Sequence, residues 1–188
     1  MRIALFGISC VGKTTVGQIM ADALGYTFVD FDHAVIERFQ TTLTALKKKC
    51  GSEYHFRLHV SPLLAQILDE YPDNLVLAMP PSGLFPEYKQ VFDYHSDVVT
   101  VWLSDKAKYI LKRLIFTDDN DQLIESPVVT KKNAWHYRDS IEDDILYYCG
   151  TLQQAQIKFK IKGRNATETA EALIEALQLN IDEIKSSN

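Results

Sequence analysis

The residues near the N-terminus whose types and spacing could do chemistry form the run GISCVGKT, which spans residues 7–14. Two glycines five positions apart, followed by a lysine and a hydroxyl residue, match the pattern GxxxxGK[ST] in full. In this pattern the backbone N–H groups of the loop and of the following helix surround phosphate oxygens. Lys13 places a positive charge near the β and γ phosphates, and Thr14 offers a hydroxyl to Mg²⁺. The run therefore predicts a loop that binds a purine nucleoside triphosphate, ATP, together with Mg²⁺.

We expect the nucleotide phosphates to contact the whole loop and the start of the helix after it. The expected contacts are Gly7, Ser9, Cys10, Val11, Gly12, Lys13, Thr14 and Thr15. A thiol beside the phosphates is poorly placed to ionise, so Cys10 is expected to have no catalytic role.

Two carboxylates follow the second expected strand, in the run FVDFD, at Asp30 and Asp32. Residues two apart in an extended stretch point the same way, so both side chains would face the phosphates. One acid could hold Mg²⁺ through water, and the other could accept or orient a hydroxyl proton. The alternative is that one of them only caps the helix that comes next.

Short apolar strands alternate with helical patterns along the chain. Strands are expected at 2–6, 27–29, 75–78, 98–103 and 157–161, and helices at 13–24, 33–39, 53–68, 105–116, 133–154 and 167–179. The local signals are Gly25 as a helix stop, Pro62 at a helix break or start, Ser104 as an N-cap, Asn165 with Glu168 as a capping box, and Lys47, Lys48 and Lys49 in a solvated turn.

This alternation predicts an α/β fold with a parallel sheet covered by helices on both faces. Ligands of such sheets bind at the carboxyl ends of the strands. The loop at 7–14, Asp30 and the segment 79–83 each follow a strand directly, so they should surround one crevice. The chain of 188 residues fits a single domain, 1–188. The segment 117–132 has little periodicity and is expected to be a mobile lid.

Composition excludes several partners. The net charge of −5 and pI near 5.5 argue against a broad nucleic-acid surface, because binding the phosphate backbone requires clustered positive charge. Apolar runs are too short for a signal peptide or a membrane span. Three widely spaced cysteines without a CxxC pair favour a reducing, cytoplasmic compartment. A monomer and a homodimer both remain open.

The chain resembles the shikimate kinase family. The resemblance is strongest over residues 1–60, in the loop, the helix ending in Leu-Gly, the Phe-x-Asp-x-Asp run, and the Ile-Glu-x-Arg and Phe-Arg patterns. The residues that carry it after the loop are Leu24, Gly25, Phe28, Asp30, Asp32, Ile36, Glu37, Phe56 and Arg57, with Arg38 in the position of the family's Arg.

The resemblance implies a three-layer P-loop NTPase fold and transfer of a phosphoryl group from ATP to a small hydroxyl compound. It implies that Asp30 assists Mg²⁺, that Asp32 contacts the acceptor hydroxyl, and that Arg57 pairs with an acceptor carboxylate. Arg113 would lie against the adenine, and residues 163–165, with Arg164 among them, would form the other side of the base pocket. The alternative for Arg113 is a solvated helix face.

The acceptor half departs from the family pattern. Where the family has three glycines, this chain has Pro80, Pro81 and Ser82 before Gly83, so Ser82 and Gly83 would have to supply donors. The lid has neither Arg nor Lys from 117 to 130, and its acids are Asp118, Asp119, Asp121 and Glu125. Asp143 occupies the place of a family arginine, and Arg138 upstream could substitute for it. We therefore expect a kinase with a different, less anionic acceptor.

Two other functions stay open. A nucleoside or nucleotide kinase shares the loop, although such enzymes usually bring several arginines to the second nucleotide. A nucleotide-binding protein with little catalysis, acting as a regulator, would also fit a lid without arginine. Trp135, beyond the lid, could line an acceptor pocket or pack against neighbouring helices.

Overall fold

The computed structural model of the protein describes residues 1–118, 120–124 and 129–186. Its centre is a parallel sheet of five strands in the order β2-β3-β1-β4-β5. The strands are β1 (Arg2–Phe6), β2 (Thr27–Asp30), β3 (Leu75–Ala78), β4 (Val98–Ser104) and β5 (Ile157–Lys160). β1 lies in the middle, and all five of its residues are buried. A strand covered on both faces must be apolar along its length, which is why the run IALF shows no alternation.

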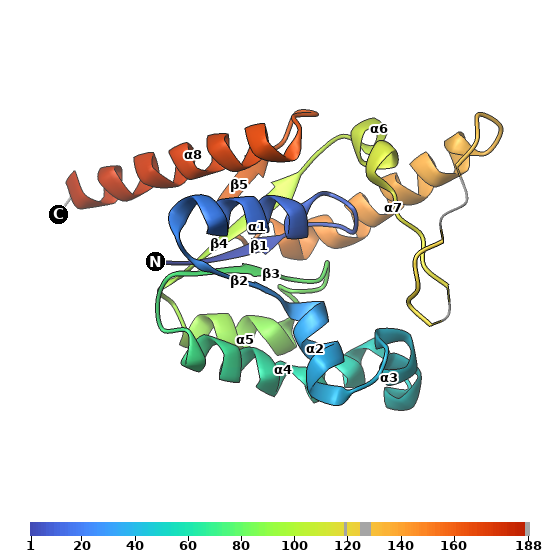
Figure 1. Ribbon diagram of the computed structural model, residues 1–188, viewed down its shortest axis with the longest axis horizontal. Coiled ribbons are helices and arrows are strands. Elements are labelled where there is room, and N and C mark those ends of the chain that lie inside the picture. Colours follow the sequence, from blue (N-terminus) through green and yellow to red (C-terminus); the bar gives the residue numbers. More distant parts are fainter. Residues whose placement is uncertain (119, 125–128, 187–188) are drawn as a thin grey trace.

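Helices cover both faces of this sheet. They are α1 (Lys13–Leu24), α2 (Phe31–Phe39), α3 (Leu43–Cys50), α4 (Glu53–Glu70), α5 (Pro86–Tyr94), α6 (Ala107–Ile110), α7 (Ala134–Leu152) and α8 (Ala166–Ser186), with a 3-10 turn, η1 (Leu111–Arg113), after α6. α1 and α8 pack together on one face, and α4 and α5 pack together on the other (Figure 1). The predicted three-layer α/β architecture is confirmed. Among the described residues, no helix combines the length and apolar character that crossing a membrane requires.

The strand register brings the predicted crevice together. Leu5 of β1 lies opposite Ala78 of β3 and Val101 of β4, and Asp30 of β2 lies opposite Ala78. The loop after β1, the start of α2 and the segment after β3 therefore leave the sheet at the same edge.

Two local signals read from the sequence are confirmed. Gly25 ends α1 with a φ of 68°, and its N–H donates to the carbonyl of Ala21. At the start of α8, the Asn165 N–H donates to the Glu168 carboxylate at 3.1 Å, and the Glu168 N–H donates to the Asn165 side chain at 2.9 Å. This reciprocal pair is a capping box.

The second strand ends differently from expectation. α2 begins at Phe31, two residues early, because the Asp30 carboxylate accepts from the N–H groups of Asp32 at 3.1 Å and His33 at 3.3 Å. Asp30 is thus an N-cap, and Asp32 lies in the first helical turn. The expectation that both acids project the same way from an extended stretch is wrong. Asp30 does cap α2, but capping is not its sole contact, because its other carboxylate oxygen accepts from the Thr14 hydroxyl.

The single helix expected at 105–116 is also wrong. Ser104 is the last residue of β4, and helical structure is limited to α6 and η1. The Asp105 carboxylate accepts from the N–H of Lys106, from the N–H of Gly163 and from the Arg113 guanidinium. These contacts tie the chain after β4 to the turn after β5, so the start of the helix is delayed.

Two helices were missed, and one proline was misplaced. α5 was not expected, and Lys47, Lys48 and Lys49 lie in the last turn of α3, which Thr42 caps and Gly51 ends. Pro62 lies inside α4 rather than at a break. A proline there leaves the carbonyl four residues earlier without its usual donor. Ser61 compensates by donating its hydroxyl to that carbonyl, on Leu58, at 3.3 Å.

The contact between α1 and the sheet predicts opposite effects for two helical glycines. A Cβ on Gly17 would lie 2.7 Å from the Phe28 ring and 3.2 Å from the Leu5 side chain, whereas a Cβ on Gly150 of α7 meets nothing within 4 Å. Gly17→Ala should lower the free energy of unfolding by about 1–3 kcal/mol through overpacking. Gly150→Ala should raise it by about 0.5–1 kcal/mol through helix propensity. Urea denaturation of both variants measures the difference, and equal shifts would contradict this packing.

Candidate nucleotide and acceptor site

The loop after β1 forms one wall of a pocket of about 440 Å³. Gly7 has a φ of 149° and Gly12 a φ of 114°, values that glycine tolerates best. Gly12 is the N-cap of α1 and has no side chain to accept from the first-turn N–H groups. Those groups therefore stay available to an anion at the helix N-terminus.

The pocket brings together much of the predicted nucleotide set. It is lined by Cys10, Val11, Gly12, Lys13, Thr14, Thr15 and Val16 from the loop and α1, and by Arg113, Ile115, Ile161, Arg164, Ala166 and Thr169 from the other side. Gly7 and Ser9 are not among the lining residues, and the Ser9 side chain is exposed. Gly7 shapes the loop instead.

Lys13 is held inside the loop. Its Nζ donates to the carbonyls of Gly7 and Ile8, each at 2.9 Å. Burial lowers the pKa of Lys13 to about 8, and the charges of Asp32 and Asp30 oppose the shift. The ammonium is thus desolvated beside two carboxylates, where its interaction with an incoming phosphate is stronger than in water.

A direct hydrogen bond joins the loop to the acidic end of β2. The Thr14 hydroxyl donates to the Asp30 carboxylate at 2.7 Å. Next to it, burial raises the pKa of Asp32 to about 6; the charge of Asp30 adds to the shift, and that of Lys13 opposes it. Lys13, Thr14, Asp30 and Asp32 therefore form one electrostatic unit where the phosphates would end.

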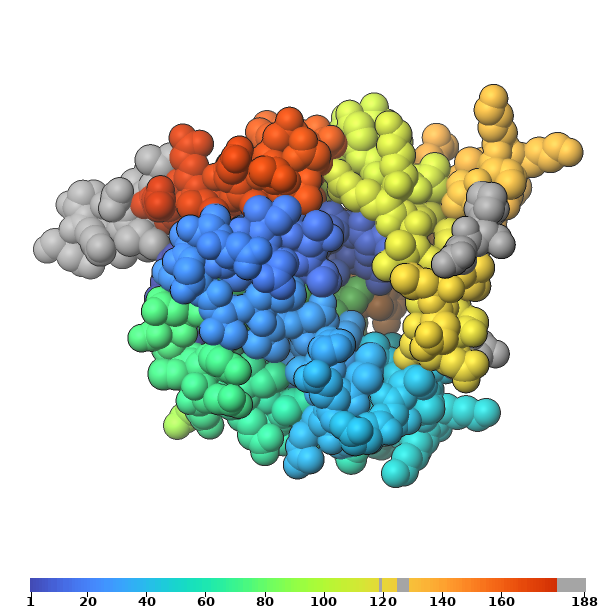
Figure 2. Space-filling model, in the orientation of Figure 1, coloured from blue at the N-terminus to red at the C-terminus, as the bar shows by residue number. Residues whose placement is uncertain are grey.

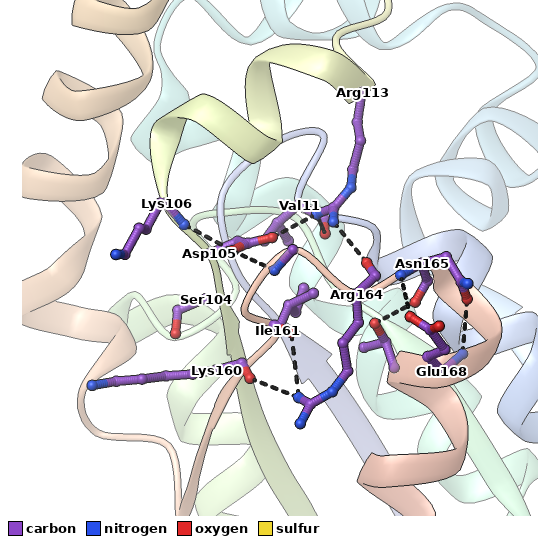
Figure 3. A network of polar contacts seen from close by, with 12 residues as sticks. Val11, Ser104, Asp105, Lys106, Arg113, Lys160, Ile161, Arg164, Asn165 and Glu168 are labelled. Atoms are coloured by element: carbon purple, nitrogen blue, oxygen red, sulfur yellow. Dashed lines mark hydrogen bonds and ion pairs between the residues drawn. The ribbon is translucent and has the colours of Figure 1, made fainter.

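The end of the pocket where the base is expected is built on Arg113. Its guanidinium donates to the carbonyls of Val11 at 3.3 Å and Arg164 at 3.0 Å, and it pairs with Asp105 at 3.0 Å (Figure 3). The Asp105 side chain is 1% exposed. Arg113 thus links the phosphate loop to the turn after β5, and the alternative of a solvated helix face does not apply to it.

The turn at 163–165 completes this end. Gly163 has a φ of 74°, and a Cβ there would lie 2.7 Å from the Tyr109 ring. The Arg164 side chain turns back to donate to the carbonyls of Ile161 and Lys160 (Figure 3). The part of Arg164 that reaches toward Arg113 is its backbone carbonyl.

Arg57 of α4, which was expected to bind the acceptor, is paired. Its Nε lies 3.0 Å from one carboxylate oxygen of Glu87, and its Nη2 lies 3.4 Å from the other. The centre of the guanidinium is 4.6 Å from the Phe85 ring centroid. Sequence reasoning found Arg57 and missed its partners Glu87 and Phe85. The sequence signal that could have revealed these partners is the aromatic residue and the acid that follow the segment 80–83.

The structure gives different environments to the three further residues that were predicted to bind the acceptor. The Gly83 N–H donates to the carbonyl of Pro80 at 2.9 Å, and Gly83 is buried, so its amide is already used in a turn. Ser82 is half-buried. Arg138 is exposed and lies 3.6 Å from Glu142, one turn further along α7.

In the segment 117–132, which was expected to be a lid, the described residues contact the start of α3 through Asp121. The Asp121 carboxylate accepts from the Leu43 N–H at 2.7 Å, from the Thr44 N–H at 3.4 Å and from the Thr44 hydroxyl at 2.7 Å. An acid at a helix N-terminus is favourable, so this lid acid has a local partner. Asp119 and Glu125 lie outside the described residues. Figure 2 shows the surface hollowed between this yellow segment and the blue N-terminal part of the chain.

A parallel sheet whose central strand ends in a phosphate loop, with a lysine and a hydroxyl beside two carboxylates, defines a P-loop phosphotransferase. The comparison with known families identifies which family of phosphotransferases this is. A family model described as shikimate kinase matches residues 9–178, and the chain belongs to the shikimate kinase family. The protein is accordingly an ATP-dependent kinase that transfers a phosphoryl group to an alcohol hydroxyl of a small molecule.

Relatives with known names cover nearly the whole chain. The chain is 24% identical over 179 residues to a shikimate kinase of Bacillus licheniformis, which is 95% of this chain and 94% of the relative. The solved shikimate kinase of Bacteroides thetaiotaomicron has a TM-score of 0.76 at 24% identity, covering 97% and 98% of the two chains. That of Acinetobacter baumannii, solved in complex with shikimate, has a TM-score of 0.74 at 22% identity, covering 95% and 93%. The structural likeness at these identities supports the fold.

The Arg113 network predicts a loss of nucleotide affinity when it is removed. Arg113→Ala should weaken ATP binding about ten- to a hundredfold, since charged hydrogen bonds contribute about 1.5–3 kcal/mol. Lys112→Ala, on the exposed neighbour of Arg113, should change it little. Titration calorimetry measures both affinities, and circular dichroism checks that both variants are folded. Equal affinities would contradict the role given to Arg113.

Proposed function

We propose that the protein transfers the γ-phosphoryl group of ATP to a hydroxyl of a small acceptor held between Asp32, Arg57 and the lid. The proposal is carried by the 2.7 Å hydrogen bond between the Thr14 hydroxyl and the Asp30 carboxylate. This contact joins the phosphate loop to the acidic end of β2, so donor phosphate and acceptor hydroxyl would meet at one place.

Thr14 and Asp30 would hold Mg²⁺. Their hydroxyl and carboxylate oxygens are hard donors of the kind that Mg²⁺ prefers, and Mg²⁺ is usually bound by one or two carboxylates plus phosphate oxygens and water. A cation there would neutralise charge on the β and γ phosphates.

The chain's own groups supply the remaining roles. Lys13 and the amides of Cys10 to Thr15 surround the phosphates and stabilise the charge that spreads over the transferring group. Asp32 orients the acceptor hydroxyl and accepts its proton, a role that its raised pKa supports. Arg57 and Ser82 position the acceptor, and Arg138 lies at the edge of the acceptor site. Arg113 and Arg164 lie beside the base of the nucleotide.

The sequence and the cysteines also support proposals for the domain organisation, the compartment and the partners of the protein. Residues 1–188 act as one domain with the lid at 117–132, as a monomer or a homodimer. Three cysteines, none in a disulfide, suit a reducing cytoplasm. The acidic net charge suits neither a nucleic-acid nor an anionic membrane partner. The acceptor is a metabolite less anionic than shikimate.

A panel of acceptors tests the central proposal. We expect Asp32→Asn to lower kcat about 10²- to 10⁴-fold with little change in ATP affinity, because only the acceptor hydroxyl loses its base. Glu37→Gln, an exposed acid of the same helix, is the matched control. ADP release is measured with shikimate, other hydroxy acids, sugars and nucleosides. ADP release with nucleosides alone would favour a nucleoside kinase. Tight ATP binding without ADP release for any acceptor of the panel would favour a regulatory protein.

The metal assignment has its own test. Asp30→Asn keeps a good N-cap for α2 but removes a charge, so the Mg²⁺ concentration for half-maximal ATP binding should rise about tenfold or more. Thr14→Ala should act in the same direction, and Gln18→Ala, one turn along α1, should not. ATP binding is followed calorimetrically across a Mg²⁺ series and after chelation. An unchanged Mg²⁺ dependence in the first two variants would remove the metal site from this position.

A further inference from the structure

The least expected feature of the acceptor side is the buried pair between Arg57 and Glu87. The Arg57 side chain is 11% exposed and that of Glu87 is 6% exposed. Burial alone would raise the pKa of Glu87, but the hydrogen bond from Arg57 and a backbone hydrogen bond hold that pKa below its usual value. Both groups are therefore charged, and together they carry no net charge.

The pairing fills one of the edges of Arg57 that are suited to an anion, the edge formed by Nε and Nη2. A guanidinium binds a carboxylate best through two parallel N–H donors. The Nε and Nη2 donors of Arg57 already face the two oxygens of Glu87. The Phe85 ring also lies against the guanidinium, with 4.6 Å between the ring centroid and the Cζ atom of Arg57. A second carboxylate would have to displace Glu87 or approach an arginine whose charge is already balanced.

The surroundings add negative charge. Asp32 and Glu53 both act electrostatically on the buried Tyr88 beside the pair. Asp144 of α7 does the same to Tyr148, whose ring meets Phe85 edge-on at 6.1 Å. Lys47 is already 3.2 Å from Glu53, and the sequence places no Lys or Arg between 117 and 130 of the lid. Lys13 and Lys47 offset part of this charge at Asp32, and Lys47 is engaged by Glu53. An acceptor with its own carboxylate would thus meet several carboxylates beside an arginine that is already paired.

The same place presents an apolar ring face. The Tyr88 hydroxyl is fully buried and finds no hydrogen-bond partner within the described ranges. Because this atom has no exposed surface, the acceptor would meet the aromatic rings and not the Tyr88 hydroxyl. Phe85 and Tyr148 form an aromatic wall, continued by the stacked ring of Tyr147 at 6.4 Å from Phe85. Aromatic rings provide a flat apolar surface with polar partners nearby.

We propose that Glu87 determines the acceptor class: by neutralising Arg57, it makes the site select an uncharged polyhydroxylated ring compound over one that carries a carboxylate. The inference rests on the proposed transfer to an acceptor between Asp32 and Arg57. Glu87 acts through Arg57 and is a positioning residue for specificity, with no part in the chemical step.

Ring acceptors matched in shape and differing mainly in charge test the inference. The two pairs are shikimate with its methyl ester, and glucuronate with glucose. For the unmodified protein we expect kcat/KM, measured by ADP release, to favour the uncharged member at least about tenfold in each pair it accepts. A ratio near one, or a preference for the carboxylate, would overturn the proposal.

Substitution of Glu87 should move that ratio. Glu87→Gln keeps the size and a hydrogen bond to Arg57 but leaves the guanidinium charge unbalanced. It should raise kcat/KM for the carboxylate member at least about tenfold and leave the uncharged member within about threefold. Glu171→Gln removes an equal charge from the exposed face of α8 and should leave the ratio unchanged. An unchanged ratio in Glu87→Gln would overturn the proposal.

Two measurements keep the test decisive. A buried substitution can prevent folding, so the double variant Arg57→Gln with Glu87→Gln is included, because it restores a neutral pair. It should retain the preference of the unmodified protein for the uncharged member, and a switch to the carboxylate would overturn the proposal.

Calorimetric binding of both members with a non-hydrolysable ATP analogue and Mg²⁺ gives the same ratio without turnover. Failure of transfer with retained selectivity in binding would thus count against the proposed function and in favour of this inference.

Discussion

The phosphate loop depends on a close approach between two strands that leaves no space for a side chain. At Gly7, where β1 leaves the sheet, a Cβ would lie 2.5 Å from the Leu103 carbonyl oxygen and 2.9 Å from the Val11 side chain. Only glycine allows the chain to turn there with a φ of 149°. The turn then places the Gly7 and Ile8 carbonyls around the Lys13 ammonium. The position of the nucleotide pocket follows from this one contact between β1 and β4.

Tertiary contacts hold the other end of the pocket. Arg113 is near the end of a short 3-10 turn, yet its guanidinium reaches Val11, 102 residues earlier, and Arg164, 51 residues later. Asp105 anchors the arrangement from the end of β4. A buried charge must be paired to be tolerated, so these residues constrain one another and fix the distance between the phosphate loop and the base side.

The two halves of the crevice have opposite electrostatic character. Around the phosphates, Lys13 and the N-terminus of α1 offer positive charge to an anion. Where the acceptor is proposed to bind, Arg57 is balanced by Glu87, and Asp121 of the proposed lid is bound to the N-terminus of α3. The match to the family extends over residues 9–178, which includes most of the phosphate loop. Differences between members of a kinase family are expected in the acceptor half, because specificity depends on the few groups that contact the acceptor.

The sequence by itself determined the phosphate loop, the alternation of strands and helices, and the family. These features are local: GISCVGKT is contiguous, Gly25 ends α1 within one turn, and Asn165 and Glu168 cap α8 three residues apart. Sequence reasoning also placed Asp30 and Asp32 at one crevice, with Arg57 added by the family resemblance. It expected an extended backbone at Asp32, which instead lies in the first turn of α2.

Only the tertiary structure decided the partners of the charged groups. Arg57 and Glu87 are 30 residues apart, and Asp121 is 78 residues from Leu43. The hydrophobic pattern of a helix indicates which face is buried, but it does not indicate which acid of another element will meet an arginine there. The charge around Arg57 was therefore decided by packing between α4 and α5, since a buried arginine and a buried glutamate are both stable only when they meet.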